Sequence, residues 1–225
     1  MCGRFTLDAT LEDLFIALKL KARFNFMPRY NIAPGQPILA ARLGATHALE
    51  YSHLKCGLVP SWMKALPTTT TLINARMETV AEKPSFRSAY RRRRCLIPAS
   101  GFYEWQKTAG PKQPYFIYRE GEAIMTFAGL WEHWQDAEGS EVETAAILTA
   151  PASKSISDIH HRMPVVVGTG DREGWLKGGK GSADILQPNI EFSSHPVSRM
   201  VNNVRNDDKT LTQEVEPFQE QTLFS

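Results

Sequence analysis

The sequence predicts a single α+β domain in which antiparallel strands dominate. The chain has 225 residues, of which 42% are hydrophobic, enough to bury one substantial core. Between residues 95 and 168 the hydrophobic side chains fall in short runs rich in aromatic and β-branched residues, which favour strands. Because no repeat, low-complexity tract or linker interrupts the sequence, residues 1–225 are expected to fold as one unit.

The first half of the chain predicts a helix followed by strands. Residues 7–20 carry leucines and a phenylalanine at helical spacing, with Asp8 or Thr10 as the N-cap. Residues 29–39 contain a Pro-Gly pair and predict a turn that leads into a short strand. Residues 47–62 alternate loosely between apolar and polar side chains, which predicts a strand ended by a proline.

Residues 72–94 are polar and irregular at first, and they predict a short helix after Pro84. This segment ends in the basic block RSAYRRRR at 87–94, which we interpret as a solvated helix end. The stretches 107–113 and 136–141 are typical of hairpin loops between strands. Further strands are predicted at residues 95–106, 113–120, 123–134, 142–152 and 161–168.

The last part of the chain predicts little regular structure. Residues 170–179 and 182–187 are expected to form short helices or turns. Residues 191–208 are expected to form a strand followed by an Asn-rich polar run, and residues 209–225 a C-terminal tail beyond the motif-bearing core of 1–208.

Composition narrows the classes of function. The net charge of +2 is too small to indicate nucleic-acid binding on its own. The chain has three widely spaced cysteines and no export signal, which predicts free thiols in a reducing compartment, the cytoplasm. No apolar run approaches the ~18 residues of a membrane span. No group of cysteines and histidines has zinc-ligand spacing, so neither a metal nor a cofactor is expected.

The opening residues MCGRF place a cysteine at position two. A buried free cysteine is the ordinary interpretation of such a residue. If Met1 is removed, however, Cys2 carries an α-amine and a thiol on adjacent carbons, and the amine titrates near ~7.7–8.0. Such an amine condenses with an aldehyde to an imine, and the thiol then closes a five-membered thiazolidine ring. This position therefore indicates covalent aldehyde capture.

Two further segments carry groups suited to chemistry. Asn74 and Arg76 are two residues apart, so on an extended segment they share a face, where they could orient an amine and hold a phosphate. A polar loop with capping roles is the alternative. Glu104 stands among aromatic residues, which would raise the pKa of its carboxyl and suit it to acid–base catalysis. The alternative is a glutamate at a strand end facing solvent.

His160, His161 and Arg162 precede an apolar strand. Neighbouring residues on a strand point to opposite faces, so the two histidines are not expected to do the same job, and His160 would share a face with Arg162. A histidine there is suited to proton transfer. Periodicity alone does not choose between them. Trp62 and Pro34 lie at turns, where exposed side chains can stack on bases of single-stranded nucleic acid. For Trp62 alone, a place in the core is the stronger interpretation.

Together these segments closely resemble the SRAP family, the SOS-response-associated peptidase-like or abasic-site-processing proteins. The resemblance runs in order from residue 1 to about residue 208 and rests on an ordered set of stretches: MCGRF, RYNIAPGQ, GLVPSW, INARMETVAEKPSFR, RCLIPASGFYEW, AGLWE, IHHRMPVVV and HPVSRMVNNVRND. It implies one α+β domain built on a barrel-like, mainly antiparallel sheet with flanking helices and a positively charged groove. It also implies a monomer that acts on abasic sites in single-stranded DNA, including junctions with duplex, as part of DNA repair.

The resemblance implies a role for each matching position. Cys2 would be the nucleophile that forms a thiazolidine DNA–protein crosslink protecting the lesion, and Asn74 would position its amine. Glu104 would be the general acid/base in forming and reversing the crosslink. His160 would assist opening of the sugar ring. Arg76, Arg162 and Arg4 would contact phosphates. Trp62 and Pro34 would form the wedge that stacks on bases.

The sequence departs from the family pattern at two positions. Cys56 stands where a tryptophan is frequent, and Ser100 where an aspartate is also common. We interpret Cys56 as a core residue, and neither departure touches a catalytic position. Two rival functions remain. One is a thiol peptidase that pairs Cys2 with His160 and cleaves its own N-terminal extension. The other is a non-covalent reader of single-stranded DNA or modified bases.

Overall fold

The computed structural model describes residues 3–18, 26–67, 72–178 and 190–218. The first half of this chain contains the elements β1 (Phe5–Leu7), α1 (Leu11–Leu18), β2 (Arg29–Ile32), β3 (Pro37–Leu43), β4 (Leu49–Cys56), β5 (Asn74–Arg76), α2 (Arg87–Arg92), β6 (Arg94–Ala99) and β7 (Gly101–Gln106). The second half contains β8 (Gln113–Tyr118), β9 (Met125–Gln135), β10 (Glu141–Pro151), β11 (Arg162–Pro164), η1 (Thr169–Asp171), α3 (Arg172–Lys177), β12 (Ser193–Pro196), η2 (Arg199–Asn202) and η3 (Lys209–Thr212).

One layer of the molecule is a closed barrel. Its strands follow the order β10-β4-β3-β6-β9, and β9 pairs again with β10, so the ring is complete. The β10–β4 pairing is parallel and the other pairings in the ring are antiparallel. Two short strands pair with the C-terminal end of β10: β5 is parallel to it and β11 is antiparallel. The predicted barrel-like architecture is therefore confirmed.

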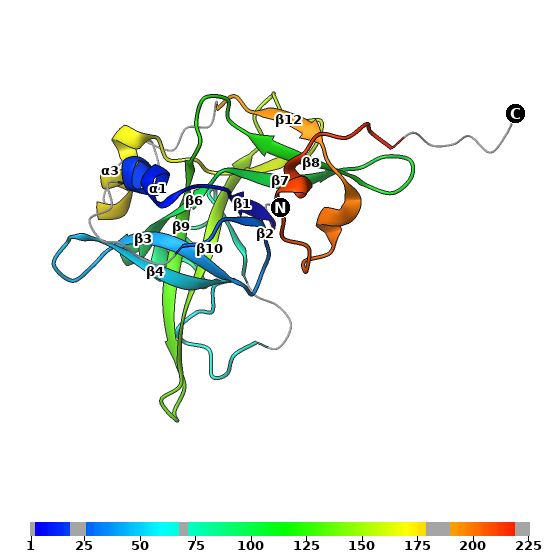
Figure 1. The fold of residues 1–225 in the computed structure, drawn as a ribbon. Helices are drawn as coiled ribbons and strands as arrows, with labels where there is room; N and C mark the ends of the chain where they lie inside the picture. Colours follow the sequence, from blue (N-terminus) through cyan, green and yellow to red (C-terminus); the bar gives the residue numbers. More distant parts are fainter. Residues whose placement is uncertain (1–2, 19–25, 68–71, 179–189, 219–225) are drawn as a thin grey trace, which may run out of the picture.

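The second layer is an antiparallel sheet with the order β12-β8-β7-β1-β2. In Figure 1, β12, β8 and β7 lie at the upper right, and β3 and β4 of the barrel lie at the lower left. The chain passes from barrel to sheet at Ser100, between β6 and β7. Ser100 is held there by two hydrogen bonds: its N–H donates to the carbonyl of Thr6, and its hydroxyl donates to the carbonyl of Asp8. The sequence predicted one run over 95–106, but these two hydrogen bonds divide it between two sheets.

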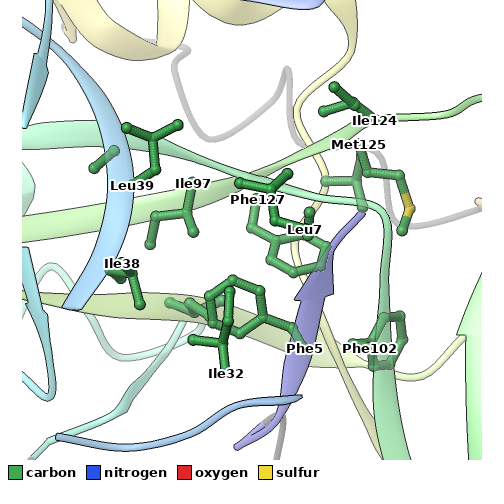
Figure 2. Close-up of a cluster of buried hydrophobic side chains, with 14 of the residues drawn as sticks. Phe5, Leu7, Ile32, Ile38, Leu39, Ile97, Phe102, Ile124, Met125 and Phe127 are labelled. Carbon is green, nitrogen blue, oxygen red and sulfur yellow. The ribbon is translucent and has the colours of Figure 1, made fainter. Parts of the chain in front are cut away.

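The main core lies between the two layers. Phe5 and Phe102 from the sheet both pack edge-on against Phe127 of β9, and Figure 2 shows Phe5 beside Ile32 within this cluster. A Cβ added at Gly101 would approach the Phe116 ring within 2.4 Å, so β7 begins at a residue without a side chain because of this close packing. A core built from both layers makes the barrel and the sheet one domain.

Several local predictions are confirmed. Helix α1 begins with a capping box, in which the Thr10 hydroxyl accepts from the Asp13 N–H and the Asp13 carboxylate accepts from the Thr10 N–H. Gly35 takes a positive φ of 83° at the turn between β2 and β3. The loops at 107–112 and 136–140 join hairpin strands. The segment 182–187 lies outside the described residues.

The basic block 87–94 is only in part a solvated helix end. Arg91 and Arg92 are exposed, but Arg93 pairs with Glu132 and Arg94 is buried, with its guanidinium over the rings of Tyr90 and Trp175. A planar guanidinium stacks on aromatic rings, which explains how this charge is accommodated inside. Residues beyond 208 also pack on the sheet, since the Val215 N–H donates to the Pro196 carbonyl. In the described part of the chain, every helix is too short to cross a bilayer.

Candidate active site

Glu104 lies on β7, where alternate residues face opposite sides of the sheet. Phe102, on the same side as Glu104, packs into the core between the two layers. The Glu104 side chain is 3% exposed. Burial raises the pKa of this carboxyl above its ordinary value, as the flanking aromatic residues predicted. The alternative of a solvent-facing glutamate is wrong, and the raised pKa favours the protonated carboxyl more than in an exposed glutamate.

His160 is the titratable neighbour of Glu104. Its Nδ1 lies 3.8 Å from Oε1 of Glu104, within reach of proton exchange once a ligand or small shift closes the gap. The same Nδ1 lies 3.0 Å from both the N–H and the carbonyl oxygen of Arg162. Burial lowers the pKa of His160, which favours the neutral imidazole at pH 7. The main chain of Arg162 thus fixes the ring in either tautomer.

His161 does not point away from His160 as a strand would require. The two imidazole rings lie side by side, with centroids 4.4 Å apart and planes inclined by 31°. The expectation of opposite faces is wrong because β11 begins only at Arg162, and both histidines belong to the preceding loop. The difference between them is exposure: His160 is partly buried beside Glu104, and His161 is exposed.

Arg162 is buried and its guanidinium is held by the protein. Nη1 and Nη2 form a bidentate ion pair with Glu78, and Nη2 also donates to the carbonyl oxygen of Thr149 at 2.5 Å. The Arg162 guanidinium lowers the pKa of Glu78. Sequence reasoning missed Glu78, which lies in the turn that follows β5.

Asn74 and Arg76 are the two ends of β5, and they alternate with the buried Ala75 as expected for one face of a strand. Arg76 pairs in register with Thr149, the residue whose carbonyl also meets Arg162. Since β5 and β11 flank opposite edges of β10 at this level, the structure brings Arg76 and Arg162 to the same end of the barrel. Arg76 is exposed and Asn74 is half-buried.

Arg4 lies on the other face of the sheet from Glu104. Its main-chain carbonyl accepts from the N–H of Tyr103, and its Nη1 donates to Asn31 Oδ1 and to the carbonyl of Val201, at 2.8 and 2.7 Å. Its guanidinium also lies 5.9 Å from the ring of Trp105. These contacts favour a structural role for Arg4.

The two predicted stacking residues are on the surface. Trp62 is 64% exposed, so its interpretation as a core residue is wrong. The loop around it is fixed instead through Met63, whose carbonyl accepts from the indole of buried Trp134. Pro34 is exposed at the turn between β2 and β3. Both side chains are available to a ligand.

Cys2 lies outside the described residues, which begin at Gly3. The residues that follow it are anchored beside β7: Phe5 pairs with Phe102. The other two cysteines are buried, and burial raises the pKa of the Cys56 thiol to about 12 and that of Cys95 as well. Neither is a thiolate near pH 7, which leaves Cys2 as the candidate nucleophile. Cys56 is a core residue, as predicted.

Within the ranges that the structure describes, histidines, cysteines and carboxylates nowhere gather in threes as a metal ion would need. Glu104 and His160 are groups suited to proton transfer, and the main chain of Arg162 contacts His160.

The family model described as SOS response associated peptidase (SRAP) matches residues 1–204. Abasic site processing protein YoaM of Bacillus subtilis is 36% identical, covering 94% of this chain and 97% of its own. Abasic site processing protein YedK of Escherichia coli is 35% identical, covering 96% and 100%. Abasic site processing protein HMCES of Gallus gallus is 33% identical, covering 81% and 65%.

Solved structures share the fold. A protein from Bacteroides thetaiotaomicron superposes with a TM-score of 0.82 at 24% identity, covering 96% of this chain and 100% of its own. A phage-related protein from Bordetella bronchiseptica superposes with a TM-score of 0.71 at 31% identity, covering 88% and 95%.

Proposed function

The chain belongs to the SOS response associated peptidase (SRAP) family, and we propose that it captures abasic sites in single-stranded DNA, and at junctions with duplex, as covalent adducts on Cys2. The names of its relatives support abasic-site processing. The observation that carries the proposal is the buried Glu104 beside His160, on the strand that anchors the residues following Cys2.

The reaction begins with the open-chain sugar of an abasic site, which presents an aldehyde. With Met1 removed, the α-amine of Cys2 adds to this carbonyl, and loss of one water leaves an imine. The Cys2 thiol then adds to the imine carbon and its proton passes to the nitrogen, which closes a thiazolidine. The adduct has the combined mass of protein and DNA less one water.

The described side chains supply proton transfer and binding. Glu104, whose pKa burial raises, gives a proton to the departing hydroxyl and takes it back when the crosslink reverses. Neutral His160 assists opening of the sugar ring. Asn74 orients the amine, and exposed Arg76 binds a phosphate beside the lesion. Arg162, held by Glu78, keeps His160 in place and adds positive potential. Pro34 and Trp62 stack on neighbouring bases.

Intact-mass spectrometry tests the proposal. The wild-type protein is incubated with a single-stranded oligonucleotide bearing one abasic site and then denatured. We expect protein without Met1 to gain the mass of the oligonucleotide less one water. Cys2→Ala is expected to form no adduct that survives denaturation, and Cys56→Ala, which removes a buried thiol, is expected to react like the wild type.

Two outcomes would contradict the proposal. A stable adduct on Cys2→Ala would exclude the thiazolidine. Absence of an adduct on wild-type protein lacking Met1 would exclude covalent capture; retained DNA binding would then indicate the non-covalent reader, and turnover of a peptide would indicate the thiol peptidase.

A further inference from the structure

The loop of residues 199–206, here called the clamped loop, follows β12 and begins with η2. The fully buried Asn31 anchors the clamped loop through hydrogen bonds. Its side-chain amide nitrogen lies 3.2, 3.1 and 2.8 Å from the main-chain carbonyl oxygens of Val201, Asn203 and Asn206, which share its two N–H donors. One side chain thus satisfies three acceptors and fixes the path of the loop.

Asp207 fixes the end of the clamped loop. Its carboxylate accepts from the main-chain N–H groups of Tyr30 and Asn31 and forms an ion pair with Arg29. Arg29 also donates to Oε1 of Gln36, at the turn that carries Pro34. The loop and that turn are therefore parts of one hydrogen-bonded surface.

The outward face of the clamped loop is apolar and basic. Met200 is 59% exposed and Val204 is 42% exposed. Arg199 and Arg205 are exposed on either side of them. Single exposed apolar residues are ordinary on protein surfaces. Here, however, a loop with many internal anchors holds two of them outward between two cations, which is the behaviour of a binding loop on a rigid support.

The clamped loop also contacts Arg4 and Trp105, on the face of the sheet opposite Glu104. Arg4, two residues after Cys2, donates to the carbonyls of Val201 and Asn202. Trp105, which follows Glu104, donates from its indole to Oδ1 of Asn202 at 2.7 Å. In Figure 1 the orange-to-red segment that contains η2 lies beside the N-terminal end of β1.

We infer that the clamped loop is a base-contacting surface, on which Met200 and Val204 pack against the bases that flank the lesion. Methionine and other apolar side chains wedge against base steps in nucleic-acid complexes, and every base offers an apolar face. Arg199 and Arg205 complement the charge of the adjoining phosphates, which favours a nucleic acid over a neutral protein partner. This inference rests on the proposed function and adds a second stacking surface to that of Pro34 and Trp62.

Fluorescence anisotropy with two single-stranded oligonucleotides tests the inference. Both carry a tetrahydrofuran residue, an abasic analogue without an aldehyde, so that binding is measured without crosslinking. In the second oligonucleotide the two nucleotides on each side of the lesion are also tetrahydrofuran, which keeps the phosphates and removes the bases. The double variant Met200→Ser with Val204→Ser is compared with wild type. Ile16→Ser, on α1, is the matched control that removes another exposed apolar side chain.

We expect the double variant to bind the first oligonucleotide about 5- to 30-fold more weakly than wild type does. On the second oligonucleotide, the double variant and wild type are expected to have the same affinity. The slope of affinity with salt is expected to stay unchanged, because no phosphate contact is removed. Ile16→Ser is expected to match wild type on both. An equal loss on both oligonucleotides, or no loss on either, overturns the inference. Failure of wild type to form an adduct at a true abasic site would overturn the proposed function alone, since these affinities are measured without it.

Discussion

The buried centre of the site and its exposed rim are held by different means. The centre consists of Glu104, His160 and Arg162, which are shielded from water and surrounded by protein contacts. The rim, represented by Trp62 and Arg76, faces solvent. Shielding shifts the pKa values of Glu104 and His160 and prepares them for proton transfer. On the proposed function, we therefore expect changes in the centre to alter the reaction rate and changes in the rim to alter affinity for DNA.

The largest expected effect comes from Glu104→Gln, which keeps the shape of the side chain and removes its ability to exchange protons. We expect the rate of adduct formation at saturating protein to fall about 10²- to 10⁴-fold, while affinity for the tetrahydrofuran oligonucleotide stays within about twofold. Single-turnover kinetics of the mass-shifted species measure the rate. A variant with the wild-type rate would show that Glu104 takes no part in the chemistry.

The same variant is expected to be more stable than wild type at pH 8. The pKa of Glu104 is raised in the folded state, so the folded protein favours the protonated carboxyl. Stability is therefore lost as the pH rises from the unfolded value of about 4.3 through the folded pKa. Thermal unfolding should show a higher Tm for Glu104→Gln at pH 8 and a gap that closes towards pH 4. A gap that widens at low pH would contradict the burial argument.

The second effect concerns stability at the centre. Arg162→Ala removes the ion pair to Glu78 and the hydrogen bonds to Thr149. We expect a loss of about 2–3 kcal/mol in the free energy of unfolding, measured by urea denaturation. Glu78→Gln is the control: it removes the charge of a partly exposed partner but leaves the bonds to Thr149, and should cost less. Equal losses for both variants would mean that the ion pair, and not Thr149, holds Arg162.

The smallest effect is expected at the rim. Arg76→Gln removes one exposed cation and should leave the Tm unchanged. Affinity for single-stranded DNA should fall about 3- to 10-fold at low salt, and the slope of affinity with salt should decrease by about 0.7, the value for one lost phosphate contact. Anisotropy titrations over a series of salt concentrations measure both. An unchanged slope would place Arg76 away from the phosphates.

Local signals in the sequence predicted much of this fold. The capping pair around Thr10, the Pro34–Gly35 turn and the hairpin loops depend on near neighbours, and the structure confirms them. Closure of the barrel depends on β10 pairing with both β9 and β4, and no local pattern specifies the β4 partner. The break at Ser100 depends on Thr6 and Asp8, more than 90 residues earlier, so residues 95–106 resembled one strand.

In the site, too, features set by near neighbours in the sequence were predicted and features set by distant partners were not. The aromatic neighbours of Glu104 predicted its shifted pKa, because they adjoin it in sequence. The contact between Glu104 and His160 joins strand β7 to the loop before β11 and required the structure. Glu78 and Asn31 were missed because their partners are distant in sequence: Arg162 for the first, and the clamped loop for the second. Polar residues of this kind look like ordinary surface residues until the fold brings their partners to them.

Strand β1 has a consequence for the order of events during synthesis. It lies between β2 and β7 in its sheet, and Phe5 pairs with Phe102. A ribosome that adds 5–20 residues per second needs about 5–20 s to reach β7 after β1 has been made. During that interval strand β7 does not exist, and the edge of β1 that will pair with it is uncovered. If Met1 is removed, as the proposed function requires, we expect its removal to be easiest before this sheet forms.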